Sequence, residues 1–205
     1  MKATESSSMR RLPPGSHGIP ADVVVRNQRE RLVAAMAEVC AERGYAEASV
    51  AAVAKRAGVS SVTFYKQFAG KRECMLAAHR QLLGRLLEEL DRARETERGG
   101  EARVRATTRT TLVLLAADPP SARLLIVEIL AAGPEGAKRH DAMVEAVGRR
   151  LLGGDPSEDD SSLTHADWVR IAGMLALIGK LVMASEAARI PELEDELVAT
   201  VLPRS

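Results

Sequence analysis

Aromatic residues are nearly absent from this chain of 205 residues. Two Phe, two Tyr and one Trp make up 2% of it, although 46% of the residues are hydrophobic. The core of such a chain must be built from Ala, Leu, Val, Ile and Met. The few rings are therefore informative, and three of them, Phe64, Tyr65 and Phe68, crowd into five positions.

Cysteine is scarce as well, since Cys40 and Cys74 are the two in the sequence. Two cysteines exclude a disulfide framework and suit a reducing compartment. No apolar run approaches the roughly 20 residues of a membrane span. The first 20 residues lack the apolar stretch of a secretory signal. We therefore expect a cytoplasmic protein with no membrane partner.

The motifs of common enzymes and metal sites are missing too. The four histidines are scattered, and the sequence has no His-Glu-x-x-His, Gly-x-Ser-x-Gly, phosphate-binding Gly loop or Cys-x-x-Cys. We expect no enzyme, no cofactor and no metal. A thiol-based redox sensor using Cys40 and Cys74 remains an alternative, although both lie on apolar helix faces, which favours inert buried thiols.

Charge is distributed unevenly along the chain. Residues 1–75 carry 12 Lys and Arg against 7 Asp and Glu, a net charge of +5, whereas residues 76–205 carry 17 against 21, a net charge of −4. A basic front on an acidic body suggests that the front meets a polyanion.

The sequence pattern predicts an all-α fold. Residues 1–20, rich in Ser, Pro and Gly, are expected to form a disordered arm, and residues 153–162 a solvated loop. Elsewhere apolar residues recur at helical spacing, with no strand-like alternation. The first expected helix, ending at Gly44, should bury one face formed by Val25, Leu32, Val33, Met36, Val39 and Cys40. The later expected helices cover residues 50–57, 61–68, 71–95, 101–117, 121–132, 135–152, 164–188 and 191–202.

Two short helices joined by a Gly turn predict a helix-turn-helix. Ser49 and Ser60 read as their N-caps, and Gly58 ends the first of them. The second helix would place its N-terminal side chains in the major groove of DNA. Its aromatic residues would have two roles. Phe64 and Phe68, four residues apart, would pack the short helix against the core, and Tyr65 would reach a phosphate oxygen.

The stretch "EASVAAVAKRAGVSSVTFYKQFAGKRECML" resembles the DNA-binding domain of the tetracycline-repressor-like (TetR-type) transcriptional regulators, over about residues 26–76. The resemblance implies a helix-turn-helix DNA-binding domain, here residues 21–70. It also implies a helical domain, residues 71–205, that binds an effector and dimerises through its last two long helices. The expected DNA-binding residues, including both caps, are Ser49, Ser60, Ser61, Val62, Thr63, Tyr65, Lys66, Gln67 and Lys71. Val62 departs from the residues common in the family, so base preference cannot be carried over. Gly70 stands where the family commonly has a Ser or Asn cap, and it is an acceptable but weaker cap.

The C-terminal half offers weaker signals. With Trp168 the one aromatic residue beyond Phe68, any pocket would be mostly aliphatic and would suit an apolar or amphipathic ligand. Arg109 and Glu128 interrupt apolar helices and are candidate ligand-orienting groups, although a structural salt bridge is favoured for each. The candidate lining residues, for which plain core is favoured, are Met143, Trp168, Met174 and Ile178.

The segment 164–188 is apolar on more than one face, which predicts that it buries one face inside its domain and another in a homodimer. A central helix of a monomer is the alternative. The expected interface residues on this helix and the next are Ala172, Gly173, Leu175, Ala176, Gly179, Leu193 and Leu197.

These features predict a homodimeric transcriptional regulator, specifically a repressor that a small ligand releases from a palindromic double-stranded operator. A regulator without an effector, and an activator, remain alternatives.

Overall fold

The protein is described by a computed structural model covering residues 20–152 and 162–202. These residues are almost entirely helical and contain no strand, which confirms the predicted all-α class. The expected arm and loop lie outside these ranges, apart from Pro20 and Ser162. The elements are α1 Ala21–Glu47, α2 Val50–Ala57, α3 Ser61–Gln67, α4 Lys71–Glu95, α5 Gly100–Ala117, α6 Pro119–Ile126, η1 Glu128–Ala132, α7 Pro134–Leu151, α8 His165–Met183, η2 Ala187–Leu193 and α9 Glu194–Val201.

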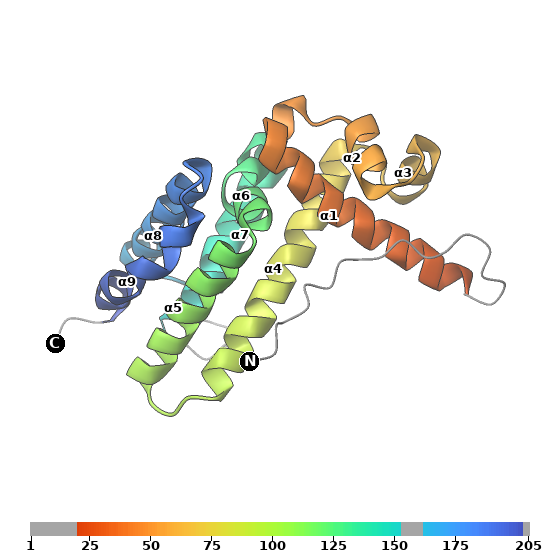
Figure 1. Ribbon diagram of the computed structural model, residues 1–205. Helices are drawn as coiled ribbons and strands as arrows, with labels where there is room; N and C mark the ends of the chain where they lie inside the picture. The colour runs from red at the N-terminus through yellow and green to blue at the C-terminus, as the bar shows by residue number, and fades with distance from the viewer. Residues whose placement is uncertain (1–19, 153–161, 203–205) are drawn as a thin grey trace.

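The helices form an N-terminal group and a larger bundle. Figure 1 shows α1, α2 and α3 on one side of the molecule and α8 and α9 on the other, with α4, α5 and α7 between them. One apolar cluster joins α1 to α3 and the first turns of α4 with Leu124, Ile129 and Ala132. A second fills the bundle, and Leu82 of α4 packs against both clusters. Because α4 runs unbroken through both regions, the predicted boundary near residue 70 stays a prediction.

Several expected helices end differently from the prediction. The expected helix 121–132 is interrupted at Val127, so that α6 and the 3-10 helix η1 are separate. Pro119 and Pro120 begin α6 instead of preceding it, because proline is tolerated in a first helical turn and the Asp118 side chain accepts from the Ser121 amide. The helix expected over 164–188 ends at Met183, and Ser185 has a φ of 60°.

The last expected helix is also divided. Pro191 lies inside η2, and α9 begins only at Glu194. Three acidic residues, Glu194, Asp195 and Glu196, form the first turn of α9, where the helix dipole favours negative charge. Val25, expected in the core, is 47% exposed, because α1 begins before the helices that cover its later turns. No helix of the described ranges combines the length and apolarity needed to cross a membrane.

His79 is buried in α4 near the junction of the two clusters. Its side chain is 1% exposed, and neither ring nitrogen has a hydrogen-bond partner of acceptable geometry among the described residues, although the Leu125 carbonyl lies nearby. Burial lowers the pKa of this imidazole from 6.5 to about 4, and the charges of Arg139 and His140 act in the same direction.

We therefore expect the protein to lose stability in mildly acid solution. The unfolded chain binds a proton on His79 below pH 6.5, whereas the folded chain resists protonation until about pH 4. Stability from this group is thus lost as the pH falls through that window, by about 1 kcal/mol between pH 7.5 and 5.5. Urea denaturation at the two pH values measures the loss, and His79→Leu should reduce it. An equal loss in the variant would contradict the assignment.

Candidate nucleic-acid interface

The helix-turn-helix is held in shape by local capping. The Ser49 hydroxyl accepts from the amide of Ala52 at 3.1 Å, and the Ser60 hydroxyl accepts from the amide of Thr63 at 3.0 Å. Gly58 has a φ of 64°, the left-handed conformation that ends α2. Both helices of the motif therefore begin where the sequence predicted, and α2 also ends there, because these signals act within a few residues; α3 ends at Gln67, one residue before the prediction.

The seven-residue helix α3 has one inner and one outer face. Phe64 and Phe68 are 0% and 2% exposed, and their ring centroids lie 5.6 Å apart, so the predicted anchoring role is confirmed. On the outer face, Val62 is 66% and Tyr65 59% exposed. The other expected contact residues are exposed or half-buried: Ser61, Thr63, Lys66 and Gln67. Geometry thus brings the α3 candidates together on one accessible surface.

Two arginines of α1 support this surface from behind. Arg29 Nη1 donates to the Gln67 carbonyl at 2.9 Å, and its guanidinium lies 4.3 Å from the Phe68 ring centroid. Arg31 Nε donates to the Ala57 carbonyl at 2.8 Å, so it caps the end of α2. The sequence analysis missed both roles, because partners 26 to 38 residues away leave no local signal.

Lys71 is placed differently from the expectation. Its ammonium donates to the carbonyls of Tyr45, Ala46 and Ala48, each at 3.0 Å, and lies 4.7 Å from the Tyr45 ring centroid. It therefore caps the segment that joins α1 to α2. A phosphate contact for Lys71 remains a prediction that competes with these three hydrogen bonds.

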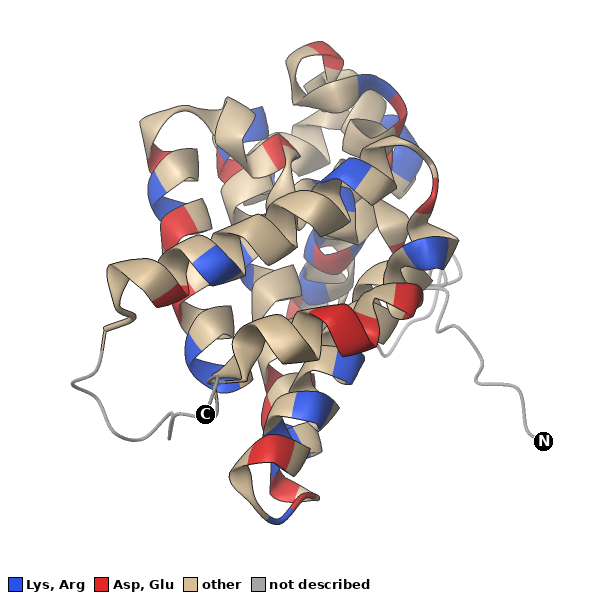
Figure 2. Ribbon diagram, turned by 90° about the vertical axis from the view of Figure 1, so that its left-hand side faces the viewer, with Lys and Arg blue, Asp and Glu red and all other residues tan. Residues whose placement is uncertain are grey.

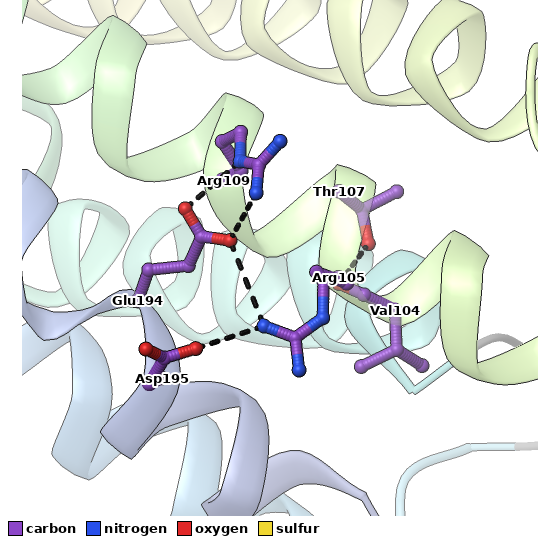
Figure 3. A network of polar contacts seen from close by, with 6 residues as sticks. All are labelled: Val104, Arg105, Thr107, Arg109, Glu194 and Asp195. Carbon is purple, nitrogen blue, oxygen red and sulfur yellow. Dashed lines mark hydrogen bonds and ion pairs between the residues drawn. The ribbon is translucent and has the colours of Figure 1, made fainter.

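Arg109 does not point into the interior of the bundle. Its side chain is 61% exposed and forms a bidentate pair with Glu194, through Nε at 2.9 Å and Nη2 at 2.8 Å, while Arg105 pairs with Asp195 at 2.9 Å (Figure 3). The hydrogen bonds from Arg109 lower the pKa of the Glu194 carboxyl. The structure thus shows the salt-bridge alternative at this site.

Glu128 forms a second salt bridge, with Arg123, and is buried at the junction with α1. It is 7% exposed, accepts from Arg123 Nε at 2.7 Å, and accepts from the Tyr45 amide at 2.6 Å. The remaining candidate ligand residues come together, since Met143, Met174 and Ile178 share the bundle core and Trp168 packs at its margin. Arg109 and Glu128 therefore lie apart from them.

The exposed face of α8 consists partly of residues other than those expected in the dimer interface. Leu175, Gly179 and Leu197 are buried within their own chain, and a Cβ on Gly179 would lie 3.1 Å from the Ile126 side chain. Ala172 and Leu193 are half-buried. The exposed stripe, which we call the outer stripe, consists of Val169, Gly173, Ala176, Lys180 and Met183. Figure 2 faces α8 and α9 and shows the acidic first turn of α9 in red, whereas the middle of α8, residues 171–179, carries no charge.

Neither redox nor metal chemistry finds support in the geometry. Cys40 and Cys74 are both 0% exposed, and burial raises the pKa of each thiol to about 12. Thiolate is the reactive form, so both thiols are poorly suited to sensing. Within the described part of the chain, no cluster of three or more His, Cys, Asp or Glu is arranged to hold a metal ion.

Comparison with known proteins gives a consistent picture. Residues 32–78 match the model of the bacterial regulatory proteins of the tetR family. The chain is 29% identical over 119 residues to the HTH-type transcriptional activator FasR of Mycolicibacterium smegmatis, a match over 58% of this chain and 54% of that protein. It is 31% identical over 61 residues to the Fatty acid metabolism regulator protein of Bacillus subtilis, over 30% of this chain and 31% of that one. The matches thus span about half and about a third of those relatives.

Solved structures share the fold over most of their length. The regulator FadR from Bacillus subtilis, in complex with stearoyl-CoA, aligns with a TM-score of 0.70 at 20% identity over 84% of this chain and 96% of that one. A transcriptional regulator from Rhodococcus sp. Rha1 aligns with a TM-score of 0.63 at 28% identity over 84% and 93%. An N-terminal helix-turn-helix followed by a helical domain is common to this group.

Proposed function

We propose that this chain, whose residues 32–78 match the model of the bacterial regulatory proteins of the tetR family, belongs to that family. It would act in the cytoplasm as a dimeric regulator that binds a palindromic operator and releases it when an amphipathic ligand binds. The match of residues 32–78 and the regulators that this chain resembles support a transcriptional regulator rather than an enzyme. The dimer, the operator and the ligand are the proposal.

The observation that carries DNA binding is the outer face of α3. A large apolar side chain and a phenol, Val62 and Tyr65, are exposed on a helix that is otherwise pinned down by two buried rings. Exposed groups of this kind on a short helix can contact base edges and the sugar-phosphate backbone in a major groove. Ser61 and Lys66 add a hydroxyl and an ammonium beside them, which suit base edges and phosphates.

The outer stripe of α8 supports a homodimer. Its members recur every three or four residues, and small Gly173 and Ala176 at its centre permit close approach of a second helix. A two-fold axis through this face would present two α3 helices to successive major grooves, which is why we propose a palindromic operator. Lys180 is the one charged member of the stripe, and Glu196, exposed in the acidic first turn of α9, offers a partner for it in a second copy.

An amphipathic ligand with a long apolar chain is proposed from the bundle core. That core is aliphatic, with Met143 and Met174 as its adaptable members. The Thr108 hydroxyl of α5 is fully buried and has no partner among the described residues, an arrangement that a polar atom of a ligand would relieve. The FadR structure with stearoyl-CoA and the relative named for fatty acid metabolism make a long acyl thioester the first ligand to test.

Tyr65→Phe is expected to weaken binding to every duplex by about three- to tenfold, because it removes one phosphate hydrogen bond. Thr63→Ala should in addition change the preferred bases, since in the proposed complex its hydroxyl and methyl would face the groove. Operators selected from a random DNA library, followed by gel-shift titration, measure both effects. Tyr45→Phe is the matched control, because Tyr45 is buried away from α3, and it should bind as the wild type does.

Ligand release is tested on the same operator. Stearoyl-CoA should dissociate the wild-type complex, whereas coenzyme A alone should not. A palindromic selected site would support the dimer and the DNA-binding function together. Selection that yields no site, or equal binding by Tyr65→Ala and wild type, would contradict the function.

A further inference from the structure

The C-terminal end of α1 is sharply kinked. Gly44 has φ 75° and ψ 159°, a backbone conformation that essentially only glycine adopts. A Cβ at this position would make ordinary contacts of 3.7 Å or more, so the requirement for glycine comes from the backbone and not from lack of space. The kink separates the Tyr45 amide from the Ala41 carbonyl, the acceptor it would have in a continuous helix.

An ion pair from the effector domain takes the place of that helical hydrogen bond. Arg123 Nη1 donates to the Ala41 carbonyl at 2.7 Å, and Glu128 Oε2 accepts from the Tyr45 amide at 2.6 Å. The two side chains are joined by Arg123 Nε donating to Glu128 Oε1 at 2.7 Å. We call Arg123 and Glu128 the wedge pair, because they are inserted between the two halves of an opened helical hydrogen bond.

The wedge pair belongs to the segment that connects α1 with the rest of the effector domain. Arg123 lies in α6, and Glu128 begins η1. On its other side this segment packs against α8, since a Cβ on Gly179 would lie 3.1 Å and 3.3 Å from side-chain atoms of Ile126 and Val127. A displacement of α6 against α8 would therefore be passed directly to the end of α1.

Lys71 holds the same stretch from the DNA-binding side. Its hydrogen bonds to the carbonyls of Tyr45, Ala46 and Ala48 fix the chain just beyond the kink. The backbone from Ala41 to Ala48 is thus fixed by charged groups of both regions.

We infer that Arg123 and Glu128 are positioning residues, which set the direction of the DNA-binding helices relative to the effector domain by occupying the Gly44 kink. Stability alone does not require such a pair, because apolar residues of similar volume often replace a buried ion pair at little cost. What apolar residues cannot supply is a donor and an acceptor aimed at two chosen backbone atoms. This inference rests on the proposed function, since it makes α6 the element through which a ligand would alter the spacing of two DNA-binding heads.

The test uses the double variant Arg123→Met/Glu128→Leu in the full-length protein. Its thermal unfolding midpoint should fall by roughly several degrees, because the Ala41 carbonyl and the Tyr45 amide lose their partners. The Tyr45 amide should exchange with solvent roughly tenfold faster, because its buried acceptor is gone. Arg109→Met/Glu194→Leu is the matched control, since it removes an ion pair that joins α5 to α9 without touching α1. It should leave the Tyr45 amide protected. Unchanged exchange in the first variant would overturn the inference.

A spectroscopic measurement addresses position directly. A spin label at an engineered cysteine, Lys55→Cys, lies on the exposed side of α2, and the buried native thiols should not react with the label. The distance distribution between the two heads of a dimer should be narrow in the wild type and broader in the double variant. A double variant whose distance distribution equals that of the wild type overturns the inference. If the double variant fails to fold, Glu128→Gln takes its place. This substitution keeps the volume and one acceptor oxygen, so it should broaden the distribution less than the double variant would, and a distribution equal to that of the wild type again overturns the inference.

Different results would contradict the proposed function and the positioning role of the wedge pair. If the wild type binds no duplex, the proposed function fails, while amide exchange on the free protein still decides the role of the wedge pair. If stearoyl-CoA releases the operator from wild type and double variant at the same concentration, the function stands and the positioning role is overturned.

Discussion

Replacing Phe64 with alanine is expected to lower the free energy of unfolding of the N-terminal helices by about 3–5 kcal/mol and to abolish operator binding. The Phe64 side chain is 0% exposed and packs against Phe68 beneath a helix of seven residues. A helix this short is unstable by itself, so its orientation depends on the burial of that ring. Urea denaturation followed by circular dichroism, with gel-shift titration on the selected operator, measures both losses.

Tyr65→Ala is the matched control, because it removes a neighbouring ring from the same helix. The Tyr65 side chain is 59% exposed, so its loss should change the free energy of unfolding by no more than about 0.5 kcal/mol. Binding should nevertheless fall. A Phe64→Ala variant with unchanged stability, or a Tyr65→Ala variant as unstable as Phe64→Ala, would refute the division between an inner anchor and an outer contact face.

The local part of the fold was predictable because its signals act over a few residues. Ser49 and Ser60 cap helices that begin next to them, and Gly58 supplies a left-handed residue that its own position requires. The ring pair Phe64 and Phe68 was likewise assigned to the core from its spacing. In each case the residues that carry the sequence signal and the feature that they determine lie within one or two turns of each other.

The errors arose where long-range packing decides. Which face of α8 is buried depends on its packing against α6, which the sequence of α8 does not show. The sequence therefore predicts Leu175 and Gly179 in the dimer interface, whereas in the structure both lie on the inner face, with Gly179 against Ile126 of α6. Arg31 and Arg123 reach carbonyls 26 and 82 residues away, which no local pattern signals. Arg109 and Glu128 look alike in sequence, as single charges in apolar helices. One lies on the surface and the other at the junction with α1, because η1 packs against α1 whereas Arg109 of α5 faces Glu194 of α9.

Lys71→Met is expected to lower the free energy of unfolding by about 2–3 kcal/mol and to leave the salt dependence of DNA binding unchanged. The ammonium donates to three carbonyls at 3.0 Å in the segment between α1 and α2, and methionine can donate to none of them. A charged donor shared by three acceptors, two of them partly buried, contributes more than a surface ion pair, which explains the size of the loss. Affinity should fall only through the loosened placement of α2 and α3.

Lys66→Met should give the opposite result and so serves as the control. Lys66 is exposed on α3 with no ion pair among the described residues, so its loss should barely affect stability. If its ammonium meets a phosphate, each half-site loses one released counterion, and the slope of log K against log salt falls by about 0.9 per subunit. Operator titrations over a range of salt concentrations, paired with urea denaturation, separate the two lysines. A reduced salt slope in Lys71→Met would mean that this ammonium leaves its three carbonyls for the DNA when the complex forms.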